Sequence, residues 1–326
     1  MLYSVTAIIV IRFMRTALLS LLTLVLFISC KDRSPHNVYS APAVSNKAIF
    51  KIQNPIISDT ILYYNDFKSS YVDDRNLEIW LPQGYPLTGV SYKVLYMHDG
   101  QNVFNKDTSS YGTAWEIDEK IDSLTSASAI APTIVVNTWC HPKKRFNEYM
   151  PQQPKEVTET AFAKAELKKN TGYDKLYSNE YLKFITSEVL PFVRDNFQVS
   201  EHPKDNVIMG SSMGGLISLY AMMEYPRVFG NAGCLSTHWP VPVLGEAFIE
   251  SLPQTIPEPS FHRIYFDYGT KTLDASYEPY QKKVDSIFKL KGYNNDNYRS
   301  LKFNGHEHSE AYWQQRVAPA LVFLLN

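Results

Sequence analysis

The spacing of apolar residues changes several times along the chain, and each spacing predicts a different element. Alternation of apolar and polar residues over 76–81 is typical of a strand with one buried face, whereas the apolar run 132–137 suits a strand buried on both faces. Apolar residues recur every three or four positions over 181–197, which predicts an amphipathic helix. Further strands are predicted at 92–97, 206–209 and 263–267, and further helices at 216–223 and 310–325.

Strands and helices therefore alternate along most of the chain, and this order favours an α/β fold with a mostly parallel sheet and helices on both of its faces. The 326 residues show no internal repeat, so a single large domain over 51–326 is the simplest interpretation. Residues 141–176 interrupt the rhythm with a charged insertion that is long for a connection in a compact domain. We expect a lid or a substrate-binding wall there, with a solvated excursion as the alternative.

The first 30 residues have the layout of a signal peptide. Two arginines precede an apolar run, 16–29, that is short for a membrane span. The run ends in a small residue followed by Cys30, which resembles the lipobox of bacterial lipoproteins, in which the cysteine is acylated. We therefore expect a tether at 31–50 and an exported protein, anchored by lipid in the bacterial periplasm or at the outer membrane. A start at Met14 would give a more conventional leader, and an uncleaved N-terminal anchor is the alternative.

The net charge and the cysteines indicate whether the protein could bind nucleic acid, form a disulfide or hold a metal ion. Lys and Arg total 32 against 33 Asp and Glu, so the net charge of -1 offers no footprint for nucleic acid. Of the three cysteines, Cys30 would carry lipid, while an oxidising compartment would permit but not require a disulfide between Cys140 and Cys234. No cysteine has metal-ligand spacing, so no metal is expected.

The strongest chemical signal is the run Gly-Ser-Ser-Met-Gly around Ser212, which satisfies the pattern G-x-S-x-G. A serine hydroxyl is a weak nucleophile unless it projects from a sharp turn where a base reaches it, and the strand and helix expected on either side supply that turn. So tight a turn calls for glycine at Gly210 and Gly214, and Gly215 should ease the packing of the helix. We predict Ser212 as the nucleophile, because Ser211 lacks glycines at both flanking positions.

A nucleophilic serine needs an acid and a histidine base, which follow it along the chain in that order in this kind of fold. Only His306 and His308 come after the last predicted strand, and either could be the base. The acid is expected in the turn after the late strand, where it would hold the imidazole in one tautomer. Asp274 is our prediction, with Asp267 and Glu278 as alternatives.

Ester hydrolysis also needs two backbone N–H groups that stabilise the oxyanion, one from the residue after the nucleophile and one from a loop after an early strand. Met213 supplies the first. The strand that ends at Met97 leads into a loop in which Gly100 would let the backbone approach and Gln101 would supply the second N–H.

At this point the sequence resembles an esterase family of the α/β-hydrolases, which includes enterochelin esterases, feruloyl and acetyl-xylan esterases, and mycolyltransferases. The resemblance rests on four segments: VLYMHDGQNVF at 94–104, RFNEYMP at 145–151, VIMGSSMGGLISLY at 207–220 and GHEHSEAYWQQRV at 305–317. The family's histidine is followed by Asn or Ser, then Glu, and later Trp, which points to His308 as the base. The likeness also implies that His238 and Trp239 lie in a loop near the site, where they would contact the substrate.

Together these features predict a lipid-anchored serine esterase that needs no cofactor. The resemblance implies a small-molecule or polysaccharide-linked ester as substrate, and we expect acyl esters of polysaccharide, such as feruloyl or acetyl esters. A siderophore ester hydrolase and an acyltransferase with the same triad are alternatives. A lipid-tethered binding protein that kept the fold and lost turnover is the alternative from a different class.

Overall fold

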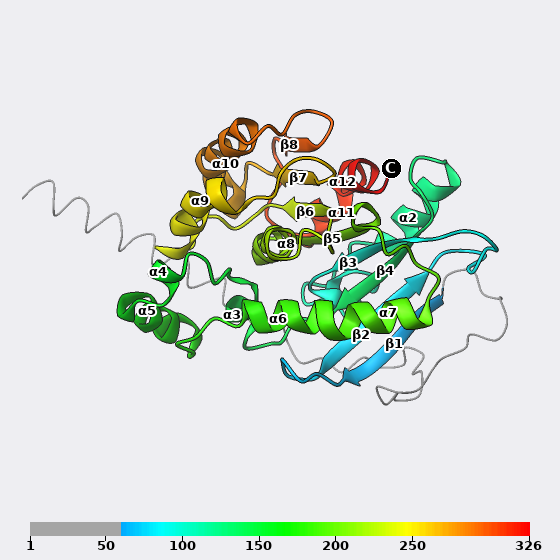
Figure 1. The fold of residues 1–326 in the computed structure, drawn as a ribbon, viewed down its shortest axis with the longest axis horizontal. Coiled ribbons are helices and arrows are strands. Elements are labelled where there is room, and N and C mark those ends of the chain that lie inside the picture. The colour runs from blue at the N-terminus through cyan, green and yellow to red at the C-terminus, as the bar shows by residue number, and fades with distance from the viewer. Residues whose placement is uncertain (1–59) are drawn as a thin grey trace, which may run out of the picture.

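The structure is a computed structural model that describes residues 60–326, and they form one sheet of eight strands in the order β1-β2-β4-β3-β5-β6-β7-β8 (Figure 1). The pairs β1-β2 and β2-β4 are antiparallel, and every other neighbouring pair is parallel. The strands are β1 (Thr60–Phe67), β2 (Arg75–Leu81), β3 (Lys93–Met97), β4 (Thr133–Thr138), β5 (Asn206–Ser211), β6 (Asn231–Leu235), β7 (Arg263–Tyr268) and β8 (Tyr298–Lys302).

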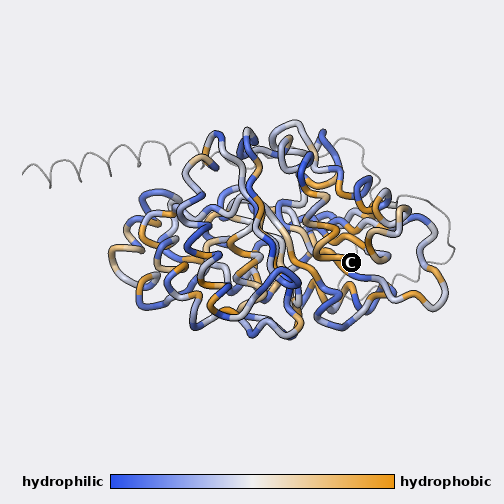
Figure 2. The backbone as a smooth tube through the Cα atoms, turned by 90° about the horizontal axis from the view of Figure 1, so that it is seen from above, coloured by the Kyte–Doolittle hydropathy of each residue, from blue (hydrophilic) through white to orange (hydrophobic). Residues whose placement is uncertain are grey.

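Helices cover both faces of the sheet (Figure 1). Side chains alternate between two apolar clusters along each central strand, so that in β5 Ile208 joins one cluster and Val207 and Met209 join the other. Figure 2 shows hydrophobic segments running through the interior, with hydrophilic ones over many of the outer loops. The helices are α2 (Ile117–Ser126), α3 (Arg145–Tyr149), α4 (Lys155–Thr158), α5 (Ala161–Thr171), α6 (Ser178–Phe184), α7 (Leu190–Asn196), α8 (Met213–Glu224), α9 (Leu244–Thr255), α10 (Glu278–Leu290), α11 (Glu310–Arg316) and α12 (Ala318–Leu325).

The predicted α/β fold with a mostly parallel sheet is confirmed, but two predicted helices differ in shape. The helix over 181–197 runs as α6, a π-helical turn (Ile185–Val189) and α7. The closing helix over 310–325 divides into α11 and α12. Pro319 lies in the first turn of α12, where its missing N–H removes no helical hydrogen bond. Strands β1, β6 and β8 have no counterpart among the predicted strands.

The parallel strands determine where the site lies. β3, β5, β6 and β7 are consecutive neighbours in the sheet and point the same way. The loops that follow them therefore emerge at one edge, where ligands bind in open α/β sheets. These loops carry the residues around Gln101, Ser212, His238 and Asp274.

Residues 141–176 form part of the body and a peripheral arm. Helix α3 contacts α6 and α8, while α4 contacts α5 and α9. Figure 1 shows α4 and α5 at one end of the molecule. A role for this segment as a lid or substrate wall stays a prediction.

The predicted signal peptide, the lipid on Cys30 and the tether at 31–50 lie outside the described residues. Within 60–326, the structure contains no helix that is both long enough and apolar enough to cross a bilayer.

Candidate active site

Ser212 lies at the turn between β5 and α8, where it caps the N-terminus of the helix. Its backbone is strained, with φ at 59° and ψ at -120°, a region that side chains other than glycine rarely occupy. The turn is held by neighbouring backbone, because the N–H of Ser212 donates to the carbonyl oxygen of Leu235 at 2.9 Å. This conformation is the one a nucleophile elbow requires.

The glycines around the turn differ in how strictly they are needed. A Cβ on Gly210 would lie 3.0 Å from the backbone of Gly214, and a Cβ on Gly215 would lie 2.8 Å from Oγ1 of Thr237. A Cβ on Gly214 would meet its nearest atom at 3.6 Å, an ordinary contact. The close approach therefore accounts for Gly210 and Gly215, whereas nothing in the packing demands glycine at Gly214.

His308 and Asp274 come together at the same edge of the sheet. Nδ1 of His308 lies 2.6 Å from Oδ1 of Asp274, which is part of the short helix η5 (Thr272–Ser276) after β7. The two loops are joined through the backbone, since the N–H groups of Thr270 and Lys271 both donate to the carbonyl oxygen of His306. The backbone of His306 thus ties these loops together, and His308 is the histidine that bonds to Asp274.

The two alternative acids lie elsewhere. Asp267 is buried in β7, where its carboxylate pairs with Arg316 at 3.2 Å. Glu278, at the start of α10, pairs with Lys282 and Lys302 at the surface. Neither alternative carboxylate has a hydrogen bond to His308 among the described contacts.

Asp274 is held in its ionised form. Burial by itself would raise its pKa, but hydrogen bonds from His308, from the Ser236 hydroxyl and from the N–H of Gly269 outweigh burial and lower it. For Asp267 the balance is different, because burial raises its pKa to about 6 although Arg316 opposes that rise. Asp274 is therefore the stronger acid of the two, as an acid that must stay charged beside an imidazolium should be.

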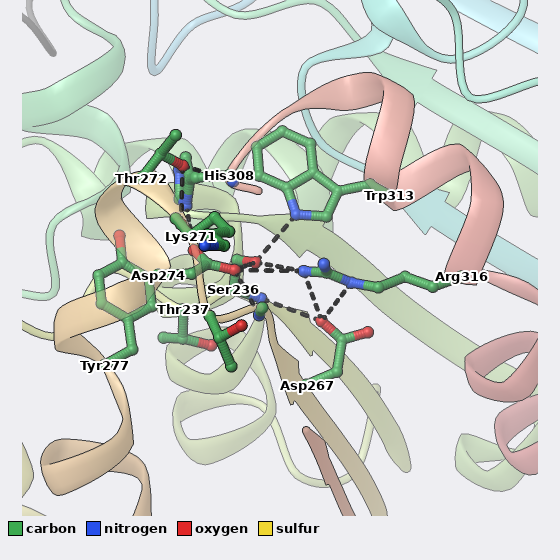
Figure 3. A network of polar contacts seen from close by, with 12 residues as sticks. Ser236, Thr237, Asp267, Lys271, Thr272, Asp274, Tyr277, His308, Trp313 and Arg316 are labelled. Carbon is green, nitrogen blue, oxygen red and sulfur yellow. Dashed lines mark hydrogen bonds and ion pairs between the residues drawn. The ribbon is translucent and has the colours of Figure 1, made fainter. Parts of the chain in front are cut away.

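Figure 3 shows a polar network behind Asp274 that the sequence did not predict. Ser236, in the loop after β6, donates to Asp274, and Trp313 and Arg316 of α11 donate to Ser236. A buried arginine in a C-terminal helix is unusual, but burial cannot be read from the sequence. Gly269 carried a readable signal, because it directly follows the late strand. A Cβ on Gly269 would collide with the His306 carbonyl oxygen, 2.2 Å away.

The two predicted substrate contacts differ in position. His238 lies close to both Ser212 and His308. Its backbone N–H donates to the carbonyl oxygen of Ser212 at 3.2 Å, and its ring centre lies 6.5 Å from that of His308. Burial, followed by the positive charges around it, lowers the pKa of His238 to about 3. Trp239 is only 1% exposed and its indole N–H donates to Gln281. Trp239 therefore packs in the core of this structure, and its contact with a substrate stays a prediction.

Both predicted oxyanion donors are backbone groups at the same edge. Met213 is the first residue of α8, so its N–H has no partner within the helix. Gln101 lies in the helical turn η2 (Gly100–Asn102) that follows β3. Gly100 lets this turn approach β4, since a Cβ there would lie 2.9 Å from both Asn137 and Trp139. The assignment of Met213 and Gln101 as donors stays a prediction.

The described residues also bear on the predicted disulfide and on metal binding. Cys234 is a free, buried thiol in β6, so it forms no disulfide with Cys140. Burial raises the pKa of Cys234, which makes it unreactive. Residues 60–326 contain no group of three or more His, Cys, Asp or Glu side chains arranged to hold a metal ion.

Comparison with known proteins identifies the family. The model of the family described as "Putative esterase" matches residues 69–324, and the chain therefore belongs to that family. YbbA of Bacillus subtilis (strain 168) is 23% identical over 260 residues, which make up 77% of this chain and 92% of YbbA.

Solved structures share the fold. A ferulic acid esterase matches 82% of this chain and 98% of its own, with a TM-score of 0.60 and 15% identity. The enterobactin esterase FES from Shigella flexneri, determined in the presence of 2,3-di-hydroxy-N-benzoyl-glycine, matches 83% of this chain with a TM-score of 0.57 and 16% identity. The match spans 60% of the length of FES. These similarities confirm the predicted α/β-hydrolase fold.

Proposed function

We propose that the protein is a serine carboxylic-ester hydrolase with Ser212 as nucleophile, His308 as base and Asp274 as acid. The observation that carries the proposal is the His308–Asp274 hydrogen bond of 2.6 Å, formed beside the strained turn of Ser212. His238 links the two parts, since it bonds to the backbone of Ser212 and its ring lies next to that of His308.

The proposed mechanism gives each residue one step. Because Nδ1 of His308 donates to Asp274, the lone pair of a neutral His308 is on Nε2. Nε2 takes the proton of Ser212 as its Oγ attacks the ester carbonyl, and the N–H groups of Met213 and Gln101 stabilise the oxyanion. Collapse of the tetrahedral intermediate breaks the ester bond, and His308 returns the proton to the departing alcohol. Water then attacks the acyl-enzyme with His308 as base, releasing the acid and restoring Ser212.

For the substrate we infer an acyl ester of polysaccharide, hydrolysed by an exported protein that is anchored through a lipid on Cys30. Similarity in fold to a ferulic acid esterase supports this choice. A siderophore ester is the second candidate, supported by the similarity to the enterobactin esterase FES. An acyltransferase would use the same residues and admit a second alcohol in place of water.

Covalent labelling tests the chemistry. The full-length chain in mild detergent is treated with a fluorophosphonate probe and with p-nitrophenyl acetate, alongside Ser212→Ala and His308→Ala. We expect labelling and hydrolysis in the wild type and loss of both in the two variants. Ser211→Ala is the matched control, because it makes the same change one residue away and should keep labelling. A folded wild type that is not labelled would favour the binding protein instead.

A substrate panel tests the specificity. Feruloylated and acetylated xylan oligosaccharides are compared with a 2,3-dihydroxybenzoyl-serine ester, and kcat/KM is measured for each. We expect the sugar esters to be preferred; a preference for the catecholate ester would favour the siderophore. Formation of a new ester when a sugar alcohol is added would favour the acyltransferase.

A further inference from the structure

Ser236 is the first residue after β6 and has an unusual position. Its side chain is fully buried, and its backbone has φ at 42°, in the left-handed region. The N–H of Ser236 donates to the carbonyl oxygen of Asp267 at 2.8 Å, which extends the pairing between β6 and β7 by one residue. The backbone of the neighbouring strand therefore determines where the Ser236 hydroxyl lies.

The hydroxyl of Ser236 has three partners, and their chemistry determines which way each hydrogen bond runs. Nε1 of Trp313 lies 3.0 Å from the Ser236 oxygen, and an Nη2 of Arg316 lies 2.5 Å from it. Both of these nitrogens can only donate, so they use the two lone pairs of the hydroxyl oxygen. The single hydrogen of the hydroxyl must then go to Oδ2 of Asp274, 2.6 Å away. Each bonding position of the hydroxyl is therefore occupied (Figure 3).

This arrangement directs the other oxygen of Asp274 at the base. Oδ2 accepts from Ser236, from the N–H of Gly269 at 2.6 Å and more distantly from Arg316 at 3.4 Å. Oδ1 is left for Nδ1 of His308. A carboxylate with one oxygen bonded on several sides cannot rotate without breaking those bonds, so the orientation of His308 follows from the donors on the far oxygen.

The Ser236 hydroxyl also bonds to Trp313, the side chain that packs on the imidazole of His308. The Trp313 indole meets the His308 ring edge to face, with ring centres 4.9 Å apart. Since Trp313 donates to Ser236, one oxygen atom links the acid to the indole that packs on the base. Arg316 balances the charge, because its buried guanidinium pairs with both Asp267 and Asp274.

We propose that Ser236 is a positioning residue of the triad, which holds Asp274 and Trp313 through one hydroxyl and so fixes the orientation of His308. The proposal rests on the proposed function of Ser212, His308 and Asp274. Ser236 itself touches neither the substrate nor the reacting atoms.

Removing the hydroxyl should change turnover more than binding. Without Ser236 as donor, Oδ2 of Asp274 keeps only the N–H of Gly269 and the distant Arg316, so the carboxylate is held less firmly. We expect kcat to fall about 10- to 100-fold, as for other groups that orient a catalytic ligand or base. KM should stay within about twofold, because no substrate contact is lost. The pH profile of kcat/KM should also change, because Asp274 loses a hydrogen bond that lowers its pKa.

The test compares Ser236→Ala and Ser236→Gly with Ser276→Ala in the full-length chain. Glycine suits the left-handed backbone at this position, so Ser236→Gly removes the hydroxyl while relieving backbone strain. Ser276→Ala is the matched control, because Ser276 is exposed and, within residues 60–326, its hydroxyl bonds only to the carbonyl oxygen of Leu273. Values of kcat and KM are measured from pH 5 to pH 9, and folding is checked by thermal melting.

A second measurement needs no turnover. In a Ser212→Ala background, a histidine proton that is bonded to a carboxylate gives a far-downfield NMR signal, assigned by its loss in His308→Ala. We expect Ser236→Ala to shift or broaden this signal and Ser276→Ala to leave it unchanged. This measurement separates the two proposals, since it succeeds or fails even if the wild type hydrolyses no ester.

The outcomes are distinct. A lower kcat with a changed pH profile in both Ser236 variants, or a changed histidine signal, supports the proposal. An active wild type whose Ser236 variants are folded and keep kcat, the pH profile and the histidine signal overturns it. Loss of stability alone, with kcat and the pH profile unchanged, also overturns it, because a purely structural serine would behave in that way.

Discussion

The two sides of the proposed active site are built in different ways. The serine side comprises residues 98–102 and 210–215, and the acid side comprises Ser236, 267–274 and 306–316. On the serine side, backbone makes the site: a strained φ at Ser212 and a close approach at Gly210 set the geometry. On the acid side, side chains make it, through hydrogen bonds and charges that join three loops and a helix.

Because the two sides are built differently, they should be sensitive to different substitutions. A backbone turn depends on space, so the serine side should be most sensitive to added atoms. A buried polar network depends on matched donors and acceptors, so the acid side should be most sensitive to the loss of a charge or a donor. Substitutions that add an atom on the serine side, or remove a donor or a charge on the acid side, separate these two kinds of sensitivity.

The largest effect is expected from the nucleophile. Ser212→Ala should lower kcat on the order of 10⁵-fold, since the other triad members then have no group to activate. Its stability should change by less than about 1 kcal/mol, because alanine also has a Cβ at the strained φ. Ester hydrolysis and urea denaturation measure the two quantities. If Ser212→Ala kept more than a tenth of the wild-type rate, Ser212 would not be the nucleophile.

The next effect separates the two buried acids. Asp274→Asn should lower kcat about 10⁴-fold, because the amide favours the wrong tautomer of His308. Asp267→Asn should lower kcat less than about tenfold but destabilise the fold by about 2–3 kcal/mol, because Arg316 loses a buried counter-charge. The same rate assay and denaturation series compare them. A larger loss of kcat in Asp267→Asn than in Asp274→Asn would make Asp267 the acid.

A smaller effect tests the role of space on the serine side. Gly210→Ala should destabilise the protein by about 1–3 kcal/mol, because its Cβ would lie 3.0 Å from the backbone of Gly214. Gly214→Ala should be neutral or stabilise by up to about 1 kcal/mol, since its Cβ has room and alanine favours a helix. Urea denaturation gives both values. Equal destabilisation by the two variants would contradict the packing argument.

The smallest effect concerns Glu310, which joins the two sides because it accepts a long hydrogen bond, 3.4 Å, from Nδ2 of Asn102. Burial raises the pKa of Glu310 to about 7, from an ordinary value near 4.5. The folded state therefore favours the protonated acid, so its contribution to stability is complete below about pH 4.5 and is lost as the pH rises toward 7. Glu310→Gln stays neutral and should remove this dependence, worth on the order of 2 kcal/mol.

The check is denaturation of wild type and Glu310→Gln from pH 4 to pH 8. The stability of the variant relative to the wild type should rise with pH and level off above about pH 7. A constant difference across this range would mean that folding does not change the pKa of Glu310.

Prediction from sequence was most complete where geometry is local. The elbow at Ser212 needs a strand, a glycine turn and a helix in immediate succession, and all three are visible in a short stretch of sequence. Strands β3, β4, β5 and β7 were found for the same reason, because a run of apolar residues marks each one. β6 and the edge strand β8 lacked such a signal, since NAGCL is short and rich in small residues and YRSLK is mostly polar.

Chain order and apolar pattern by themselves determined the fold class, the predicted nucleophile and the restriction of the base to two histidines. The fold class and the nucleophile depend on patterns among residues near one another in sequence, and the choice of histidines depends on their order along the chain. Only the tertiary structure decided that Asp274 and not Asp267 bonds to His308, that Trp239 is buried, and that Ser236 and Arg316 stand behind the acid. Hydrogen bonds and burial there join residues up to 80 positions apart, as in the bond between Arg316 and Ser236, and no local pattern carries such a pairing.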